Sequence, residues 1–153
     1  MKTIAVLVDF SDVTFKLLKQ AHVLASAFGS EVVLLHVVPP DPVVVDFGMA
    51  PTVYRPPSAE TIQSEGDRMA QLQESLTKFG TRTSTRQLQA TRVEDLLAEC
   101  ERVQADMIIV GSHGHGALYN LLVGSITAQV LKKAPCPVLV VPSDPAAESE
   151  KAA

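Results

Sequence analysis

The hydrophobic positions of this chain form short unbroken runs, which alternate with longer stretches in which apolar residues recur every three or four positions. An unbroken run of β-branched and aliphatic residues is typical of a strand that is covered on both faces. Such runs predict strands at 2–9, 31–38, 107–110 and 137–141. The stretch 81–89 is polar and rich in threonine, which predicts a strand only at the edge of a sheet.

The intervening stretches have the period of amphipathic helices. We predict the first helix after Ser11, which we expect to cap it, and its end at Gly29. A second helix runs from 58 to 80, a third follows the capping-box sequence at 91–94, and a fourth covers 124–133. The expected apolar stripe of the second helix consists of Ile62, Met69, Leu72, Leu76 and Phe79.

The segment 39–57 separates the second strand from the second helix and contains six of the ten prolines in the chain. Proline fixes φ and removes a hydrogen-bond donor. We therefore predict a surface loop without regular structure.

Strands and helices thus alternate strictly along the chain. This order predicts an α/β fold, an open parallel sheet of five strands with helices on both faces. In such sheets ligands bind beyond the carboxyl ends of the strands, where the direction of winding reverses.

Length and composition agree with one globular domain. The chain has 153 residues, of which 46% are hydrophobic and 5% aromatic, with no tryptophan, so its core must be aliphatic. We predict a single domain at 1–142 and a disordered tail at 143–153, which is rich in alanine, glutamate and serine.

The charge balance excludes some classes of partner. A net charge of −4 argues against a nucleic-acid-binding surface and still allows a small anionic ligand in a local pocket. No aliphatic run is long enough to span a membrane and the amino terminus lacks signal-peptide features, so we expect a cytoplasmic protein with no membrane partner. Cys100 and Cys136 lack metal-type spacing, and we expect both to be reduced.

A glycine-rich loop, Gly111 to Gly116, follows the fourth strand, and the pair Gly124-Ser125 opens the last helix. Free N–H groups in such a loop and at a helix amino terminus favour anions, and phosphate is the natural occupant. The loop is not a P-loop, because Ala117 and Leu118 stand where lysine and serine or threonine are needed. The dinucleotide fingerprint is also absent, because no glycine follows the first strand directly.

The pattern Gly-x2-Gly-x9-Gly-Ser resembles that of the universal stress protein family. The resemblance covers nearly the whole chain and includes the sequences at 8–11, 34–37, 107–114 and 134–141. It implies a Rossmann-like fold with the strand order 3-2-1-4-5 and, usually, a dimer.

The resemblance also implies a site for an adenine nucleotide, with ATP as the expected ligand and Mg or Mn held mainly through its phosphates. Asp9 would contact the ribose or the adenine, and Val37 would offer backbone groups to the base. The phosphates would lie against the glycine loop and the Gly-Ser pair, at Gly111, Ser112, His113, Gly114, His115, Gly124 and Ser125.

Simpler interpretations stand beside these. Asp9 could merely accept hydrogen bonds from amides of its own turn, and the glycines could only shape a tight turn. His113 and His115 could suggest a metal site, but no third ligand has suitable spacing. We interpret His22 and His36 as structural histidines with satisfied hydrogen bonds.

No recognisable set of residues points to acid-base or nucleophilic catalysis. We therefore favour a sensor or regulator whose nucleotide occupancy changes its conformation or its partners. One alternative is a slow ATPase or autophosphorylating protein with Ser112 or Ser125 as acceptor. Another is an interaction dimer that binds no nucleotide.

The last strand indicates where two copies would meet. Val138, Leu139, Val140 and Val141 are all apolar, yet this strand lies at a sheet edge in the order 3-2-1-4-5. A bare apolar edge invites aggregation. We expect it to pair antiparallel with the same strand of a second copy, forming a closed homodimer.

Overall fold

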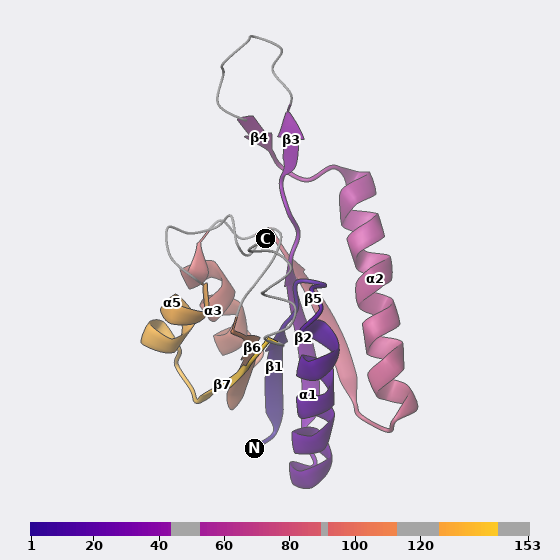
Figure 1. Cartoon of the computed structure of the whole chain (residues 1–153), viewed down its shortest axis with the longest axis vertical. Helices are drawn as coiled ribbons and strands as arrows, with labels where there is room; N and C mark the ends of the chain where they lie inside the picture. Colours follow the sequence, from indigo (N-terminus) through magenta and orange to yellow (C-terminus); the bar gives the residue numbers. More distant parts are fainter. Residues whose placement is uncertain (44–52, 90–91, 113–125, 144–153) are drawn as a thin grey trace.

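A parallel sheet of five strands forms the centre of the molecule (Figure 1). The structure is a computed structural model and describes residues 1–43, 53–89, 92–112 and 126–143. The strands of this sheet are β1 (Thr3–Leu7), β2 (Glu31–Val37), β5 (Thr83–Leu88), β6 (Met107–Gly111) and β7 (Val138–Val141). They lie in the order β5-β2-β1-β6-β7, with every neighbouring pair parallel. The α/β fold and the order 3-2-1-4-5, counted over these five strands, are therefore confirmed.

Helices cover both faces of the sheet. One face packs against α1 (Thr14–Phe28) and α2 (Ala59–Lys78), and the other against α3 (Val93–Arg102) and α5 (Ile126–Lys133). Successive side chains of a strand point to opposite faces, and β1 accordingly supplies alternate residues to the two cores. All five residues of β1 are buried, which explains why the sequence of this strand shows no polar alternation.

The turn before β6 is tied to the start of β1. The Asp106 carboxylate accepts hydrogen bonds from the backbone N–H groups of Lys2 and Thr3, at 2.6 and 3.0 Å. These two hydrogen bonds hold the pKa of Asp106 below its ordinary value. The side chain therefore fixes the amino ends of two neighbouring strands relative to each other.

The proline-rich segment contains regular structure, so the prediction of an irregular loop was wrong. Strands β3 (Asp41–Val43) and β4 (Val53–Arg55) pair antiparallel in a separate two-stranded ribbon, which lies beyond the carboxyl edge of the main sheet (Figure 1). Each strand of such a ribbon has an unpaired edge, where a proline without an N–H group is tolerated. The Asp41 carboxylate also anchors the ribbon, since it accepts hydrogen bonds from the Ser58 amide and the Thr61 hydroxyl at the start of α2.

Two predicted helix caps differ from the structure. Ser11 does not cap α1, because a turn follows it and Val13 is the N-cap residue, with no side-chain cap hydrogen bond. The predicted capping box of α3 is also wrong: Arg92 is the N-cap residue, and the Glu94 side chain pairs with Lys133 of α5. In both cases a tertiary contact or turn replaces the local bond.

The second helix and the polar strand otherwise agree with their predictions. Ser58 caps α2 by accepting a hydrogen bond from the Thr61 amide, and Met69, Leu72 and Leu76 are buried. Phe79, which was expected on the same stripe, lies after the helix and is 73% exposed. Strand β5 lies at the sheet edge, as predicted. Within the described ranges, no helix is both long and apolar enough to cross a membrane.

Candidate functional site

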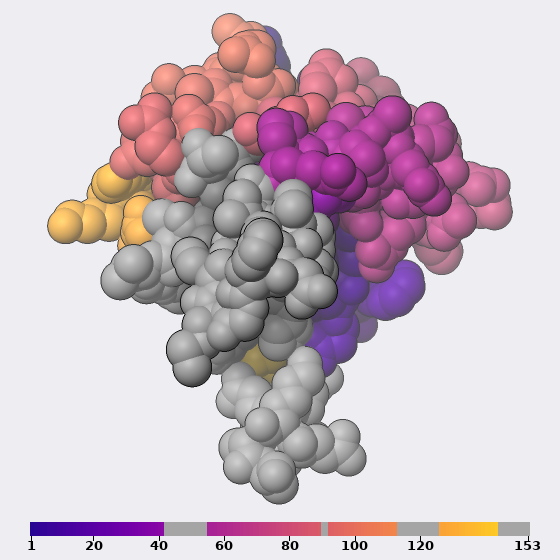
Figure 2. All heavy atoms as spheres, turned by 90° about the horizontal axis from the view of Figure 1, so that it is seen from above, coloured from indigo at the N-terminus to yellow at the C-terminus, as the bar shows by residue number. Residues whose placement is uncertain are grey.

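The carboxyl ends of β1, β2 and β6 meet at one edge of the sheet. Strand β1 pairs with β2 on one side and with β6 on the other, so the chain winds in opposite directions from this point. Ligands of open α/β sheets bind at such a switch point. Figure 2 views the molecule from this end, with α2 in magenta on one side and the salmon-coloured segment that contains α3 on another.

Four of the predicted site residues lie at this edge. Asp9 follows β1, Val37 ends β2, Gly111 ends β6, and Ser112 follows Gly111. The other five predicted residues, His113, Gly114, His115, Gly124 and Ser125, lie outside the described residues. The sheet thus brings the two halves of the expected site, its nucleoside end and the start of its phosphate loop, to the same edge.

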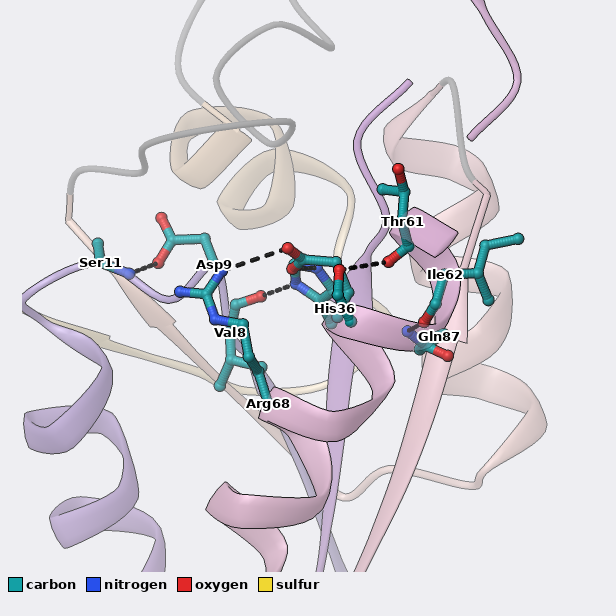
Figure 3. A network of polar contacts seen from close by, with 10 residues as sticks. Val8, Asp9, Ser11, His36, Thr61, Ile62, Arg68 and Gln87 are labelled. Atoms are coloured by element: carbon teal, nitrogen blue, oxygen red, sulfur yellow. Dashed lines mark hydrogen bonds and ion pairs between the residues drawn. The ribbon is translucent and has the colours of Figure 1, made fainter. Parts of the chain in front are cut away.

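Asp9 is held by its own turn. Its Oδ1 accepts a hydrogen bond from the Ser11 backbone N–H at 3.0 Å (Figure 3), which is the turn bond that the simpler interpretation predicts. Between them Phe10 has a φ of 58°, in the left-handed region that a phenylalanine rarely adopts. The turn therefore fixes the carboxylate at the strand end at the cost of some backbone strain.

Val37 and the end of β6 are fixed by different contacts. The Val37 side chain is buried, so only its backbone could meet a ligand, as the resemblance implies. Thr127 of α5 donates a hydrogen bond from its hydroxyl to the Gly111 carbonyl at 2.7 Å. The Ser112 hydroxyl accepts a hydrogen bond from the Ser143 amide at 3.1 Å, and the Ser112 amide donates to the Val141 carbonyl at 2.9 Å.

His36 lies directly beneath this edge and is 4% exposed. Its Nδ1 lies 2.9 Å from the carbonyl oxygen of Val8, and its Nε2 lies 3.0 Å from Glu65 Oε2 of α2 (Figure 3). The second distance is that of an ion pair, yet Nε2 has no hydrogen-bond partner of good geometry among the described residues. Burial lowers the pKa of His36 below its ordinary value of 6.5, although the Val8 carbonyl and the Glu65 carboxylate act in the opposite direction.

The interpretation of the two histidines as structural is thus confirmed only in part. His22 Nδ1 lies 2.7 Å from the Thr81 hydroxyl, within hydrogen-bond distance. His36 is satisfied at Nδ1 but not at Nε2. A buried ring nitrogen without a hydrogen bond is costly, and therefore calls for an explanation.

An aromatic and cationic stack joins α2 to the Asp9 turn. The Arg68 guanidinium lies over the Phe10 ring, 3.9 Å from its centroid, and the Phe10 ring centroid lies 4.4 Å from that of His36. Arg68 Nη1 also lies 3.2 Å from Glu65 Oε1. Sequence periodicity missed Phe10, Glu65 and Arg68, because their partners lie in distant segments of the chain.

Two further observations concern possible metal ligands and the cysteines in the described part of the chain. There, no three His, Cys, Asp or Glu side chains gather into a group that could hold a metal ion. Cys100 and Cys136 are both free thiols. Burial raises the pKa of the Cys100 thiol to about 12, so this group is not a nucleophile at neutral pH.

Comparison with known proteins points to one family. The family model described as the universal stress protein family matches residues 1–142. A universal stress protein from Methanocaldococcus jannaschii is 30% identical over 141 residues, which cover 92% of this chain and 81% of that protein.

Two solved structures share the fold. The universal stress protein from Archaeoglobus fulgidus in complex with dAMP is 22% identical, with a TM-score of 0.67 and coverage of 92% of this chain and 97% of that chain. A universal stress protein family protein from Arabidopsis thaliana with AMP bound is 17% identical, with a TM-score of 0.62 and coverage of 95% and 94%.

Proposed function

Because the chain belongs to the universal stress protein family, as its motifs predicted, we propose that it binds an adenine nucleotide at the carboxyl edge of its sheet. One observation carries the proposal: Val37 and Gly111 end β2 and β6, and Asp9 follows β1, which lies between them at the switch point of the sheet. Complexes of two proteins of the same fold with dAMP and AMP support the choice of an adenine nucleotide.

In this proposal each strand end has its own task. The Asp9 carboxylate accepts hydrogen bonds from the nucleoside, and the Val37 backbone meets the base. The backbone around Gly111 and Ser112 begins the phosphate site, which continues through the glycine loop to Gly124 and Ser125. ATP is the expected ligand, and Mg or Mn would bind mainly through its phosphates, as the family resemblance implies.

We further propose that nucleotide occupancy serves as a regulatory signal rather than as a step in catalysis. The Asp9 turn contacts α2 through the stack of Phe10 and Arg68, so a ligand that shifts this turn also acts on a helix of the outer surface. A ligand changes a conformational equilibrium by as much as its affinities for the two states differ.

The proposed assembly is a homodimer through β7. Among the described residues this strand is hydrogen-bonded to β6 on one side and to no strand on the other, so its other edge can pair with a second copy. Antiparallel pairing of identical strands satisfies both exposed backbone edges and closes the assembly at two copies.

The nucleotide proposal is tested by thermal unfolding of a preparation shown by mass spectrometry to be free of nucleotide. A ligand that binds only the folded state stabilises it by about 2.7 kcal/mol at a hundredfold excess over Kd. We expect ATP with Mg to raise the melting temperature. An unchanged melting temperature at millimolar ATP would refute binding.

Two substitutions locate the nucleoside end. Replacing Asp9 with alanine removes a hydrogen-bond partner of the ligand. The affinity for ATP, measured by calorimetry, should fall about ten- to 150-fold. Asp12→Ala is the matched control, because Asp12 is an exposed carboxylate in the same connection. Asp9→Asn retains an acceptor for the Ser11 amide and separates loss of charge from loss of the turn.

A further inference from the structure

The Nε2 atom of His36 has no hydrogen bond to a described residue, whereas Nδ1 has one. A carbonyl oxygen has no hydrogen, so the contact between Nδ1 and the Val8 oxygen requires the ring to donate N–H from Nδ1. In the neutral ring, Nε2 then carries a lone pair, and it lies 3.0 Å from a carboxylate oxygen of Glu65. Two acceptors at this distance repel each other, whereas a proton on Nε2 makes the contact an ion pair. Movement of α2 that brings the Glu65 oxygen into line with the N–H then completes a charge-assisted hydrogen bond.

The same ring connects two elements of the proposed nucleotide site. On one side it holds the carbonyl of Val8, the residue before Asp9, and its face contacts Phe10, the residue after Asp9. On the other side it meets Glu65 of α2, and Arg68, three residues later in that helix, lies over the Phe10 ring. A change at Nε2 therefore acts on α2 and on the Asp9 turn together.

We propose that His36 is a positioning residue of the nucleotide site: uptake of one proton at Nε2 joins His36 to Glu65 and draws α2 onto the turn that carries Asp9. The proton comes from solvent and stays on the ring, so the pair changes from a net charge of −1 to zero. This inference rests on the proposed function for its effect on nucleotide, but not for the proton-linked contact itself.

The direction of the pH dependence follows from the groups around the ring. Among the described residues, the charged groups that act on it are Glu65 and Arg68, both from α2, while β1 and its turn present the Val8 carbonyl and the Phe10 ring. Burial lowers the pKa of His36, so the contact closes as the pH falls below 6.5. If the closed turn is the better nucleotide site, affinity rises over the same range and nucleotide raises the pKa of His36 by linkage.

The first arm of the test uses the free protein and does not depend on nucleotide. Nitrogen-detected NMR of the His36 ring should show the Nδ1–H tautomer at pH 8, and the amide signals of Asp9 and Ser11 should titrate with the same midpoint as the ring. The proposal would be overturned by the Nε2–H tautomer at pH 8. It would also be overturned if the amide chemical shifts of Asp9 and Ser11 did not change as His36 titrates.

The second arm measures ATP affinity against pH in two Glu65 variants. Wild-type protein should bind about fivefold tighter at pH 5.5 than at pH 8, at the lower end of typical coupling between sites. Glu65→Gln supplies an amide N–H that can donate to the neutral ring, so the contact forms without the added proton and affinity stays high at pH 8. Glu65→Ala lacks the contact at every pH, so its affinity for ATP should stay low at both pH values.

Controls separate this effect from others. ATP itself titrates in this range, so the quantity compared is the difference between each variant and the wild type at the same pH. Asp67→Asn removes an exposed carboxylate of α2 whose hydrogen-bond partner, among the residues that the structure describes, is Gln63, and should leave the profile unchanged. Equal pH profiles in wild type, Glu65→Gln and Glu65→Ala would refute the positioning role. If ATP binds at no pH while the turn amides follow His36, the nucleotide proposal fails and the proton-linked contact stands.

Discussion

Gly66 lies in the interior of α2, where a glycine has a predictable effect on stability. Glycine in a helix interior costs about 0.5–1 kcal/mol relative to alanine, chiefly through the backbone freedom that it loses on folding. A Cβ added at Gly66 would lie 3.4 Å from Oε1 of the Gln87 side chain, which is an ordinary van der Waals contact with the end of a flexible group. We therefore expect Gly66→Ala to stabilise the protein by about 0.5–1 kcal/mol.

Gly29 is the matched control, since the same substitution there should have the opposite sign. Gly29 ends α1 with a φ of 64° and has no atom within 4 Å of an added Cβ, so only the backbone conformation opposes alanine. The left-handed conformation costs a residue with a Cβ roughly 1–2 kcal/mol. Gly29→Ala should therefore destabilise the protein by about that amount.

Urea unfolding at one pH measures both variants against the wild type. The midpoint should rise for Gly66→Ala and fall for Gly29→Ala, with unchanged slopes, since neither substitution alters the surface exposed on unfolding. For a chain of this size the melting temperature should move by roughly 2–4 °C per kcal/mol. A lower midpoint for Gly66→Ala would show that the contact with Gln87 is tighter than its distance implies, and would refute this reasoning.

Four further predictions concern the core, the turn before β6, the thiols and the assembly. Ile109→Ala should cost about 2–5 kcal/mol in urea unfolding, because this side chain is 0% exposed at the centre of β6. Asp106→Ala should destabilise the protein at neutral pH, and the difference from wild type should shrink as the pH falls below 3.8, because the lowered pKa of Asp106 gives stability that is lost on protonation. Iodoacetamide should modify Cys136 before Cys100, which is fully buried, and mass spectrometry of the native protein would contradict this if it found Cys100 modified first. Light scattering should give about twice 16.4 kDa for wild type and a smaller dimer fraction for Leu139→Lys, whereas a wild-type monomer would exclude the dimer.

The fold could be predicted because its determinants are local and periodic. Runs such as Ile4 to Val8 have no polar alternation, since both faces of β1 are covered, and the polar composition of β5 marks an edge. The caps could not be predicted in the same way. Serine is a favoured N-cap residue, but the Ser11 amide donates a hydrogen bond to Asp9 and the helix starts three residues later.

The candidate site likewise contains residues that the sequence can place and contacts that it cannot. Asp9 follows β1 and Gly111 ends β6, and a residue at a strand end can be placed from the sequence once the sheet is known. The contact of His36 with Glu65 could not, because it joins a strand to a helix 29 residues later in the chain and depends on the angle at which α2 crosses the sheet. No hydrophobic period encodes a polar pair of this kind.

The two outer strands of the sheet differ in chemistry, and this difference limits how far the sheet can grow. Strand β5, at one edge, carries mostly polar side chains, among them Arg86. Gln73 of α2 donates a hydrogen bond to the Thr83 carbonyl of this strand, and Gln87 of the strand donates one to the Ile62 carbonyl of α2. A charged, polar edge is a poor template for another strand. If two copies join through β7, their free ends are both β5, so the continuous sheet would end at ten strands. The polar strand would then act as a terminator, permitting a dimer and preventing a fibre.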